Sequence, residues 1–192
     1  MKESIPNLLT IFRVLLTLVA IALVPFSPIH FYEWLLVIFI LAAATDNLDG
    51  YLARRWRVES DFGKIFDPLA DKVLTFIFLV ILYSTGTIPA VIILLLIVRD
   101  LVVDSVRAVG AAQGKVVQAI MTAKIKTVLL FVLIIAALSS LTLGAGNAVQ
   151  PLVMPLAIAA LLFSYVSAAQ YGVVFWQHYR IVKSSEKKSS AQ

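Results

Sequence analysis

Six apolar segments dominate the chain and restrict what it can fold into. Each reaches the about 20 residues that a helix needs to cross the hydrocarbon core of a bilayer. Of the 192 residues, 61% are hydrophobic and 14% are charged, whereas soluble domains carry about 25% charged residues. We therefore expect an all-α integral membrane protein with six transmembrane helices, over residues 7–26, 33–54, 66–84, 88–109, 120–142 and 150–177.

Lysine and arginine divide the connections between these segments into two sets. The connections 25–33, 83–87 and 143–150 contain neither residue, whereas the remaining connections and both termini contain many. Basic residues are enriched on the cytoplasmic side of membrane proteins, so we expect both termini in the cytoplasm. The membrane domain is expected over 1–182, followed by a basic, disordered cytoplasmic tail over 183–192.

Composition also excludes several classes of site. The chain has no cysteine and only two histidines, His30 and His178, both near expected helix ends. Disulfides and thiolate metal sites are therefore excluded, and a zinc site or histidine-based catalysis is not expected. The net charge of +5 follows the membrane topology, so we expect location in the cell membrane and no nucleic-acid partner.

Four aspartates interrupt the second and third apolar segments at ordered spacing. Asp46 and Asp49 are related by i, i+3, and Asp67 and Asp71 by i, i+4, so each pair shares one helix face. One such charge at the centre of a membrane helix costs about 2.5–3.5 kcal/mol on insertion scales. The topology places both pairs at cytoplasmic ends of neighbouring helices, so we expect them to face each other at one depth.

Carboxylates without histidine or cysteine suit Mg²⁺, Mn²⁺ or Ca²⁺. Four carboxylates exceed what one Mg²⁺ usually receives, so two metal ions on a diphosphate fit better. Gly50 and Gly63 allow a ligand to approach the backbone closely, and Arg54 suits bidentate contact with phosphate.

Two structural alternatives exist for single members of this set. Asp67 and Pro68 could cap the start of the third helix. Asp46 or Asp49 could instead pair with Arg54 or Lys72.

The complete pattern D-x2-D-G-x2-A-R-x8-G-x3-D-x3-D over residues 46–71 resembles the signature of the CDP-alcohol phosphatidyltransferase family. The resemblance implies a six-helix membrane fold, a homodimer and a site that faces the cytoplasm. It also implies two divalent cations, Mg²⁺ or Mn²⁺, with Asp71 as the general base. The implied metal ligands are Asp46, Asp49, Asp67 and Asp71, and the residues that border the CDP-lipid are Gly50, Ala53, Arg54 and Gly63.

Charged residues in the fourth and fifth segments bear on the acceptor. Arg99, Asp100, Asp104 and Arg107 fall within an arc of roughly 140°, and Lys124 and Lys126 open the next segment. We expect Arg107, Lys124 and Lys126 to bind the phosphate of an acceptor. Internal ion pairs, such as Asp104 with Arg107, are the alternative. Lys124 and Lys126 lie about 200° apart on a helix, so one of them could face lipid headgroups.

Two further stretches resemble the phosphatidylglycerophosphate synthase branch of that family. One is the set Arg99, Arg107, Gly114 and Lys124-Ile-Lys126-Thr127, in which Ala123 stands where that branch often has glycine. The other is the opening Ile5 to Arg13, where Asn7, Thr10, Arg13 and Thr17 share one helix face. Asn7 and Thr10 are expected to reach the CDP-lipid; a helix cap and a topology-setting arginine are the alternative.

These features predict transfer of a phosphatidyl group from CDP-diacylglycerol to sn-glycerol 3-phosphate, with release of CMP. Within the family, the alternatives are transfer to inositol phosphate, phosphatidylglycerol or serine. From a different class, the alternative is a transporter that couples buried carboxylates to a cation. Transporter sites lie near the bilayer midplane, often at internal repeats, whereas these aspartates lie toward one face and no repeat is evident.

Overall fold

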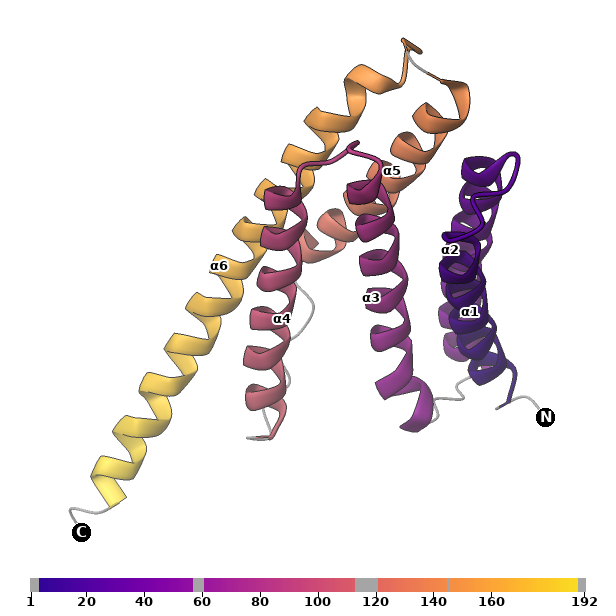
Figure 1. Cartoon of the computed structure of the whole chain (residues 1–192). Helices are drawn as coiled ribbons and strands as arrows, with labels where there is room; N and C mark the ends of the chain where they lie inside the picture. The colour runs from indigo at the N-terminus through magenta and orange to yellow at the C-terminus, as the bar shows by residue number, and fades with distance from the viewer. Residues whose placement is uncertain (1–3, 57–60, 113–120, 145, 190–192) are drawn as a thin grey trace.

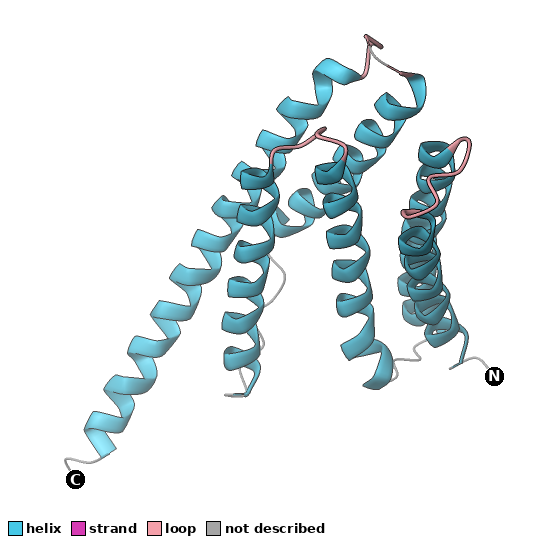
Figure 2. Cartoon of the chain, in the orientation of Figure 1, coloured by secondary structure: helices cyan, strands magenta, loops and turns pink. Residues whose placement is uncertain are grey.

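The computed structural model describes residues 4–56, 61–112, 121–144 and 146–189. Over these ranges the chain forms six α-helices joined by turns, and no strand is present among them (Figure 2). Side chains are described for most of this part, the exceptions being those of residues 4–7, 47–54, 56, 61–65, 111–112, 174–175 and 177–189.

The six helices coincide with the six apolar segments, so the all-α prediction is confirmed for the described chain. The shortest has 20 residues, which at about 1.5 Å per residue matches a hydrocarbon core of about 30 Å. Their bounds are α1 Ser4–Leu23, α2 Phe31–Trp56, α3 Asp61–Ser84, α4 Ala90–Ala112, α5 Met121–Leu143 and α6 Gln150–Ser189.

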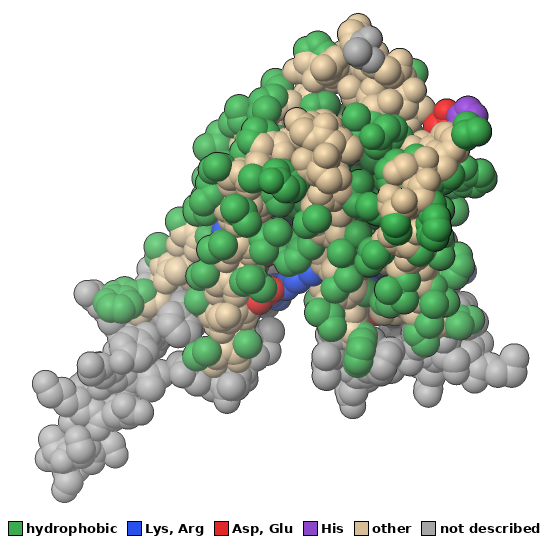
Figure 3. Space-filling model, in the orientation of Figure 1, with side chains coloured by type: hydrophobic (Ala, Val, Ile, Leu, Met, Phe, Trp, Pro, Cys, Tyr) green, Lys and Arg blue, Asp and Glu red, His purple; other side chains and the backbone are tan. Residues whose placement is uncertain are grey.

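Two of the described helices are long and apolar enough to cross a membrane on their own composition. They are α5 and the Gln150–Val173 part of α6, and Leu8–Leu23 is a shorter apolar helix. In α3 and α4, charged residues interrupt the apolar sequence toward one end. The visible surface is mostly hydrophobic side chains (Figure 3), and many large apolar residues are exposed, such as Leu94 and Leu162. An exposed apolar surface of this extent is typical of contact with lipid.

The core of the bundle joins α2, α3 and α5 through aromatic rings. Phe39 of α2 lies 4.9 Å from Phe78 of α3 and 5.4 Å from Phe131 of α5, measured between ring centroids. Tilted and edge-on pairs at this spacing are favourable arrangements of aromatic rings. α1 packs on α2 and α3, while α6 packs on α4 and α5. The aromatic contacts thereby connect helices α1 to α3 with helices α4 to α6.

The hairpin turns 24–30 and 85–89, and the described residues 144 and 146–149 between α5 and α6, all lie at one end of the bundle (Figure 1). In the last of these, Gly144 adopts a φ of +80° just after α5, a conformation that suits glycine at a helix C-terminus. Asn147 then accepts hydrogen bonds from the backbone N–H groups of Val149 and Gln150, both at 2.9 Å, and so caps α6. The charged residues of α3 and α5 lie toward the opposite end, and those of α4 extend from its middle toward that end.

The C-terminal part of the chain differs from the sequence prediction. A disordered tail was expected from residue 183, whereas α6 continues to Ser189. Extending a helix that has already formed adds one hydrogen bond for each residue fixed, without a new nucleation cost. A polar composition alone is therefore a weak signal for where such a helix ends, and the domain boundary at 182 stays a prediction.

Candidate active site

Two side chains of α1 reach three of the four predicted metal-ligating aspartates. Arg13 is completely buried, with an exposed fraction of 0%. Its Nη1 donates to Oδ1 of Asp71 at 2.7 Å, and its Nη2 lies 3.1 Å from Oδ1 of Asp46. Thr10, also buried, donates from its hydroxyl to Oδ1 of Asp67. We call this group, Thr10 and Arg13 with Asp46, Asp67 and Asp71, the carboxylate cluster.

The cluster forms because one face of α1 is polar. Thr10, Arg13 and Thr17 follow one another at i, i+3 and i+7 and are all buried. The Thr17 hydroxyl donates to the Arg13 carbonyl at 2.9 Å. α1 contacts both α2 and α3 more extensively than these two helices contact each other. The aspartates of α2 and α3 are therefore joined through Arg13, a link that the spacing of the aspartates alone could not indicate.

The structure contradicts the capping alternative for Asp67 and the pairing of Asp46 with Lys72, whereas the side chains of Asp49 and Arg54 lie outside the described part. α3 begins at Asp61, so Asp67 and Pro68 lie inside the helix and the capping interpretation is wrong. Asp46 pairs with Arg13 rather than with Lys72, because Lys72 of α3 pairs with Asp104 of α4.

Six predicted site residues lie outside the part of the structure with described side chains. Their backbone belongs to α1, α2 and α3, and their roles in binding metal or CDP-lipid stay predictions. They are Asn7, Asp49, Gly50, Ala53, Arg54 and Gly63.

The chemistry of the carboxylate cluster fits a divalent metal. Its acidic members offer hard oxygen donors from two helices, the type that Mg²⁺ and Mn²⁺ prefer. Among the described side chains, no three acidic, histidine or cysteine residues are grouped closely enough to hold a metal ion, and Asp49 is not among them. Arg13 already supplies positive charge to Asp46 and Asp71. A bound metal would have to share these carboxylates with Arg13 or displace it.

A cavity of about 260 Å³ opens between α3, α4, α5 and α6. Acidic and basic side chains are visible between the helices in this region, within an otherwise apolar surface (Figure 3). We call it the basic pocket, because four of its lining residues are cationic. Its charged and aromatic lining residues are Asp71, Lys72, Phe76, Arg99, Asp100, Asp104, Arg107, Lys126, Phe131 and Tyr171.

Asp71 belongs to both regions, since it accepts a hydrogen bond from Arg13 and also lines the basic pocket. The predicted base and two predicted phosphate-binding residues, Arg107 and Lys126, therefore share one cavity. The guanidinium carbon of Arg107 lies 5.8 Å from the centroid of the Tyr171 ring, a cation–π distance. Lys124 is exposed and does not line this pocket.

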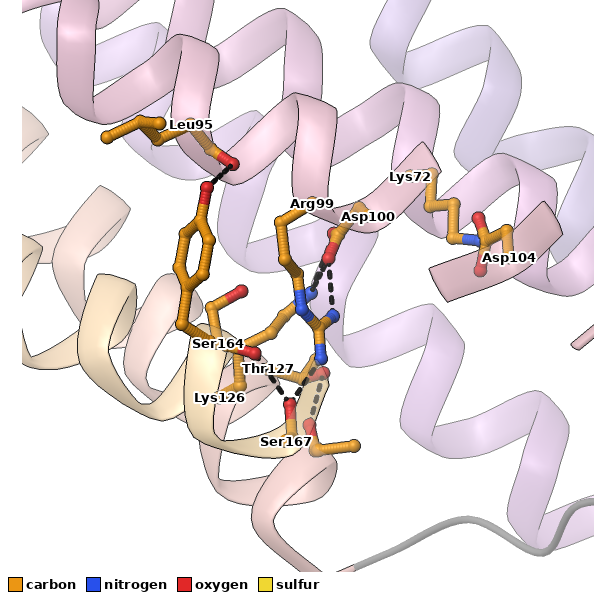
Figure 4. Close-up of polar contacts among 11 residues, drawn as sticks. Lys72, Leu95, Arg99, Asp100, Asp104, Lys126, Thr127, Ser164 and Ser167 are labelled. Carbon is orange, nitrogen blue, oxygen red and sulfur yellow. Dashed lines mark hydrogen bonds and ion pairs between the residues drawn. The ribbon is translucent and has the colours of Figure 1, made fainter. Parts of the chain in front are cut away.

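A buried ion network forms one wall of the basic pocket (Figure 4). Asp100 accepts hydrogen bonds from Nζ of Lys126 at 2.7 and 2.9 Å, and from Nη1 of Arg99 at 2.7 Å. Nη2 of Arg99 also donates to the Ser167 hydroxyl of α6. Internal ion pairing, the alternative raised for the charged residues of the fourth and fifth segments, is thus what the structure shows for Arg99, Asp100 and Lys126. The suggested pair of Asp104 with Arg107 is wrong, because Asp104 contacts Lys72.

Sequence reasoning missed the contacts of four participants for identifiable reasons. Lys72 was considered only as a partner for Asp46 or Asp49, because no pattern shows that α4 packs beside α3. Ser167 and Tyr171 lie in the apolar sixth segment, where a serine and a tyrosine four residues apart are unremarkable. Arg13 carried the clearest signal, an arginine inside an apolar run on the same face as Thr10, but that signal does not identify its partners.

Comparison with known proteins finds one matching family model and several named relatives. Residues 3–168 match the family model described as CDP-alcohol phosphatidyltransferase. The chain is similar to three proteins named CDP-diacylglycerol–glycerol-3-phosphate 3-phosphatidyltransferase. The first, from Mycoplasma pneumoniae, is 30% identical over 209 residues, which cover 97% of this chain and 92% of that protein.

The second, from Cereibacter sphaeroides, is 37% identical over 150 residues, or 76% of this chain and 66% of that protein. The third, from Bacillus subtilis, is 44% identical over 91 residues, or 47% of each chain. All three proteins have the same name and are moderately identical to this chain.

Proposed function

The chain belongs to the CDP-alcohol phosphatidyltransferase family, and we propose that it transfers the phosphatidyl group of CDP-diacylglycerol to sn-glycerol 3-phosphate. The products are phosphatidylglycerophosphate and CMP. The observation that carries this proposal is the position of Asp71 in the wall of the basic pocket, together with Arg107 and Lys126. The family consists of transferases, so the transporter alternative is set aside.

The charges of the basic pocket favour an acceptor that carries its own phosphate. Lys72 and Asp104 form a neutral pair, whereas Arg99 and Lys126 share the single carboxylate of Asp100. Arg107 adds a further positive charge beside Tyr171. Arginine and lysine in such a cavity form charge-assisted hydrogen bonds with phosphate. Serine, which has no phosphate, and phosphatidylglycerol, whose only phosphate is a singly charged diester, would form fewer such bonds than a phosphate monoester.

Asp71 suits the role of the base because it belongs to both the carboxylate cluster and the basic pocket. The acceptor hydroxyl oxygen attacks the phosphorus on the lipid side of the diphosphate, and a new P–O bond forms as the bond to CMP breaks. The proton of the hydroxyl passes to the Asp71 carboxylate, as in general base catalysis. Arg13, which donates to Oδ1 of Asp71, fixes the orientation of this carboxylate toward the pocket.

Family membership supports a requirement for divalent metal, since this family is generally metal dependent. Asp46, Asp49, Asp67 and Asp71 are proposed to hold two Mg²⁺ or Mn²⁺ ions. Bound there, the ions would neutralise the diphosphate and the charge that develops on CMP. Gly50, Ala53, Arg54, Gly63, Asn7 and Thr10 are proposed to border the CDP-lipid.

The membrane arrangement is part of the same proposal. All six helices are proposed to span the cytoplasmic membrane of the cell, with both termini and the active site on the cytoplasmic side, and the enzyme is proposed to be a homodimer. The hairpin turns at one end of the bundle contain no lysine or arginine, which supports their placement on the far side. Labelling of cysteines introduced at Ser27 and Ser184 in intact cells would test this topology, since only the cysteine at position 27 should react with an impermeant reagent.

Release of CMP from CDP-diacylglycerol by the purified, lipid-reconstituted enzyme tests the function. Release should require Mg²⁺ or Mn²⁺ together with glycerol 3-phosphate, and the lipid product should be phosphatidylglycerophosphate. Inositol phosphate, phosphatidylglycerol and serine serve as comparison acceptors. Absence of CMP release with every acceptor would remove the enzyme assignment, and preference for another acceptor would change only the substrate.

A further inference from the structure

Asp100 is distinguished from the other carboxylates of the basic pocket by its burial and its partners. It is 7% exposed, and Lys126 and Arg99 are 9% and 6% exposed. Both of its oxygens contact Lys126, and Oδ1 also contacts Arg99. One carboxylate of α4 thereby holds a cation of α5, and, through Arg99, the Ser167 hydroxyl of α6.

We propose that Asp100 is a positioning residue of the basic pocket, which holds Lys126 and Arg99 where they bind the phosphate of the acceptor. This inference rests on the proposed function. The two cations repel each other, and each is costly to bury alone. A carboxylate between them lets both remain in the same wall of the cavity.

The network retains capacity to bind an anion. Two cations share one negative charge, so the group carries a net charge of +1 in a buried wall. Nε of Arg99 is buried and has no hydrogen-bond partner among the described residues. A phosphate oxygen could accept hydrogen bonds from this wall without displacing Asp100.

The pair of Lys72 and Asp104 provides a contrast within the same pocket. It joins one cation to one carboxylate, and its side chains are 32% and 35% exposed. Such a pair is neutral and partly hydrated, so it neither concentrates charge nor fixes other groups firmly. The positioning role is therefore assigned to Asp100 rather than to Asp104.

The substitution Asp100→Asn keeps the size of the side chain and removes its charge, so it separates two effects. If Asp100 positions the cations, the KM for glycerol 3-phosphate should rise about tenfold, as expected for a lost charge-assisted contact. The kcat value and the KM for CDP-diacylglycerol should change less than about twofold. Asp100→Glu, which restores the charge, should recover most of the affinity. If Asp100 only neutralises the pocket, the KM for glycerol 3-phosphate should fall instead.

A second comparison shows whether Asp100 acts through Lys126. In an enzyme that already carries Lys126→Gln, adding Asp100→Asn should raise the KM by clearly less than about tenfold, because Lys126, one of the two cations that Asp100 positions, is gone. The control is Ser140→Ala, which changes a buried polar residue at the hairpin end of the bundle and should leave both KM values unchanged. If the Asp100→Asn enzyme does not fold, Ser167→Ala carries the test, with an expected rise of about threefold from the loss of one partner of Arg99.

The outcomes distinguish this inference from the proposed function. If the parent enzyme uses glycerol 3-phosphate and Asp100→Asn leaves its KM unchanged or lower, the positioning role is wrong and the function stands. If the parent prefers another phosphorylated alcohol, the same comparison with that alcohol decides the role of Asp100. If the parent accepts only alcohols without phosphate, both the acceptor assignment and the role of Asp100 are wrong.

Discussion

The carboxylate cluster and the wall of the basic pocket are built in opposite senses. In the carboxylate cluster, one buried cation, Arg13, contacts two carboxylates, those of Asp46 and Asp71. In the pocket wall, one buried carboxylate, Asp100, contacts two cations, Lys126 and Arg99. The carboxylate cluster thus keeps an excess of negative charge, and the pocket wall keeps an excess of positive charge. In each region, the single group of opposite sign contacts both of the others and stabilises their close approach.

This difference indicates how a small membrane protein can bind two charged substrates in neighbouring regions of opposite charge. Burying a charge without a partner is costly, so neither excess could be built from like charges alone. The negative excess suits metal ions that carry a diphosphate, and the positive excess suits a phosphorylated acceptor. Asp71 borders both regions, which is where a base for transfer between the two substrates would have to lie.

The largest effect is expected at this shared residue. Asp71→Asn should lower the rate of CMP release by about 10²–10⁴-fold, the usual contribution of a general base. The measurement is the initial rate at saturating substrates. Glu33→Gln is the matched control, because Glu33 is an exposed carboxylate at the hairpin end that pairs with His30. If Asp71→Asn retains more than about a tenth of the rate, Asp71 is not the general base shared by the carboxylate cluster and the basic pocket.

The next largest effect is expected at Arg13, the single cation of the carboxylate cluster. Arg13→Gln should lower the free energy of unfolding by about 3 kcal/mol in the presence of EDTA, because two part-exposed carboxylates lose hydrogen bonds from one fully buried cation. Saturating Mn²⁺ should recover part of this loss, since a metal bound only to the folded state stabilises it. Unfolding in detergent, followed by tryptophan fluorescence, measures both values.

An equal loss with and without Mn²⁺ would contradict the idea that Arg13 and the metal serve the same carboxylates. Arg107→Gln is the control for this comparison. Arg107 lies in an exposed position on α4, so its replacement should cost less than about 1 kcal/mol under either condition.

The role of the positive charge in the pocket wall can be tested by comparing Lys126 with Lys124, since both lie in α5. Lys126→Gln should raise the KM for glycerol 3-phosphate about tenfold, whereas Lys124→Gln should change it less than about twofold. The reason is that Lys126 lines the basic pocket and Lys124 does not. Equal effects of the two substitutions would mean that the pocket is not where the phosphate binds.

The smallest effect is expected at the ion pair of Lys72 with Asp104, in which one cation contacts one carboxylate. Lys72→Gln should lower the free energy of unfolding by no more than about 0.5–1 kcal/mol, as is usual for partly exposed ion pairs. The same fluorescence measurement of unfolding applies. A loss as large as that of Arg13→Gln would end the distinction between the buried networks and this pair.

The sequence predicted the helices well because about 20 consecutive apolar residues have few alternatives in a membrane. It predicted their ends less well, since apolarity marks lipid contact and not helix length. α3 accordingly starts at Asp61, before its apolar run, and α6 continues through the polar residues to Ser189.

The candidate site was predictable as a set of residues and not as a set of contacts. Helical spacing showed that Thr10 and Arg13 share a face, and that Lys124 and Lys126 point in different directions. It could not show that α1 packs on both α2 and α3, or which lysine faces the pocket. Partners such as Asp104 for Lys72 depend on which helices are neighbours, and periodicity within one helix contains no such information.

The central claim is that the basic pocket binds the phosphate of the acceptor next to Asp71. Its most direct test is the ratio of kcat/KM for glycerol 3-phosphate to that for glycerol, measured at one concentration of CDP-diacylglycerol and Mg²⁺. The account predicts a ratio above about 10², which corresponds to about 2.7 kcal/mol of phosphate-specific stabilisation. A ratio near one would show that the enzyme does not recognise the phosphate and would contradict the account.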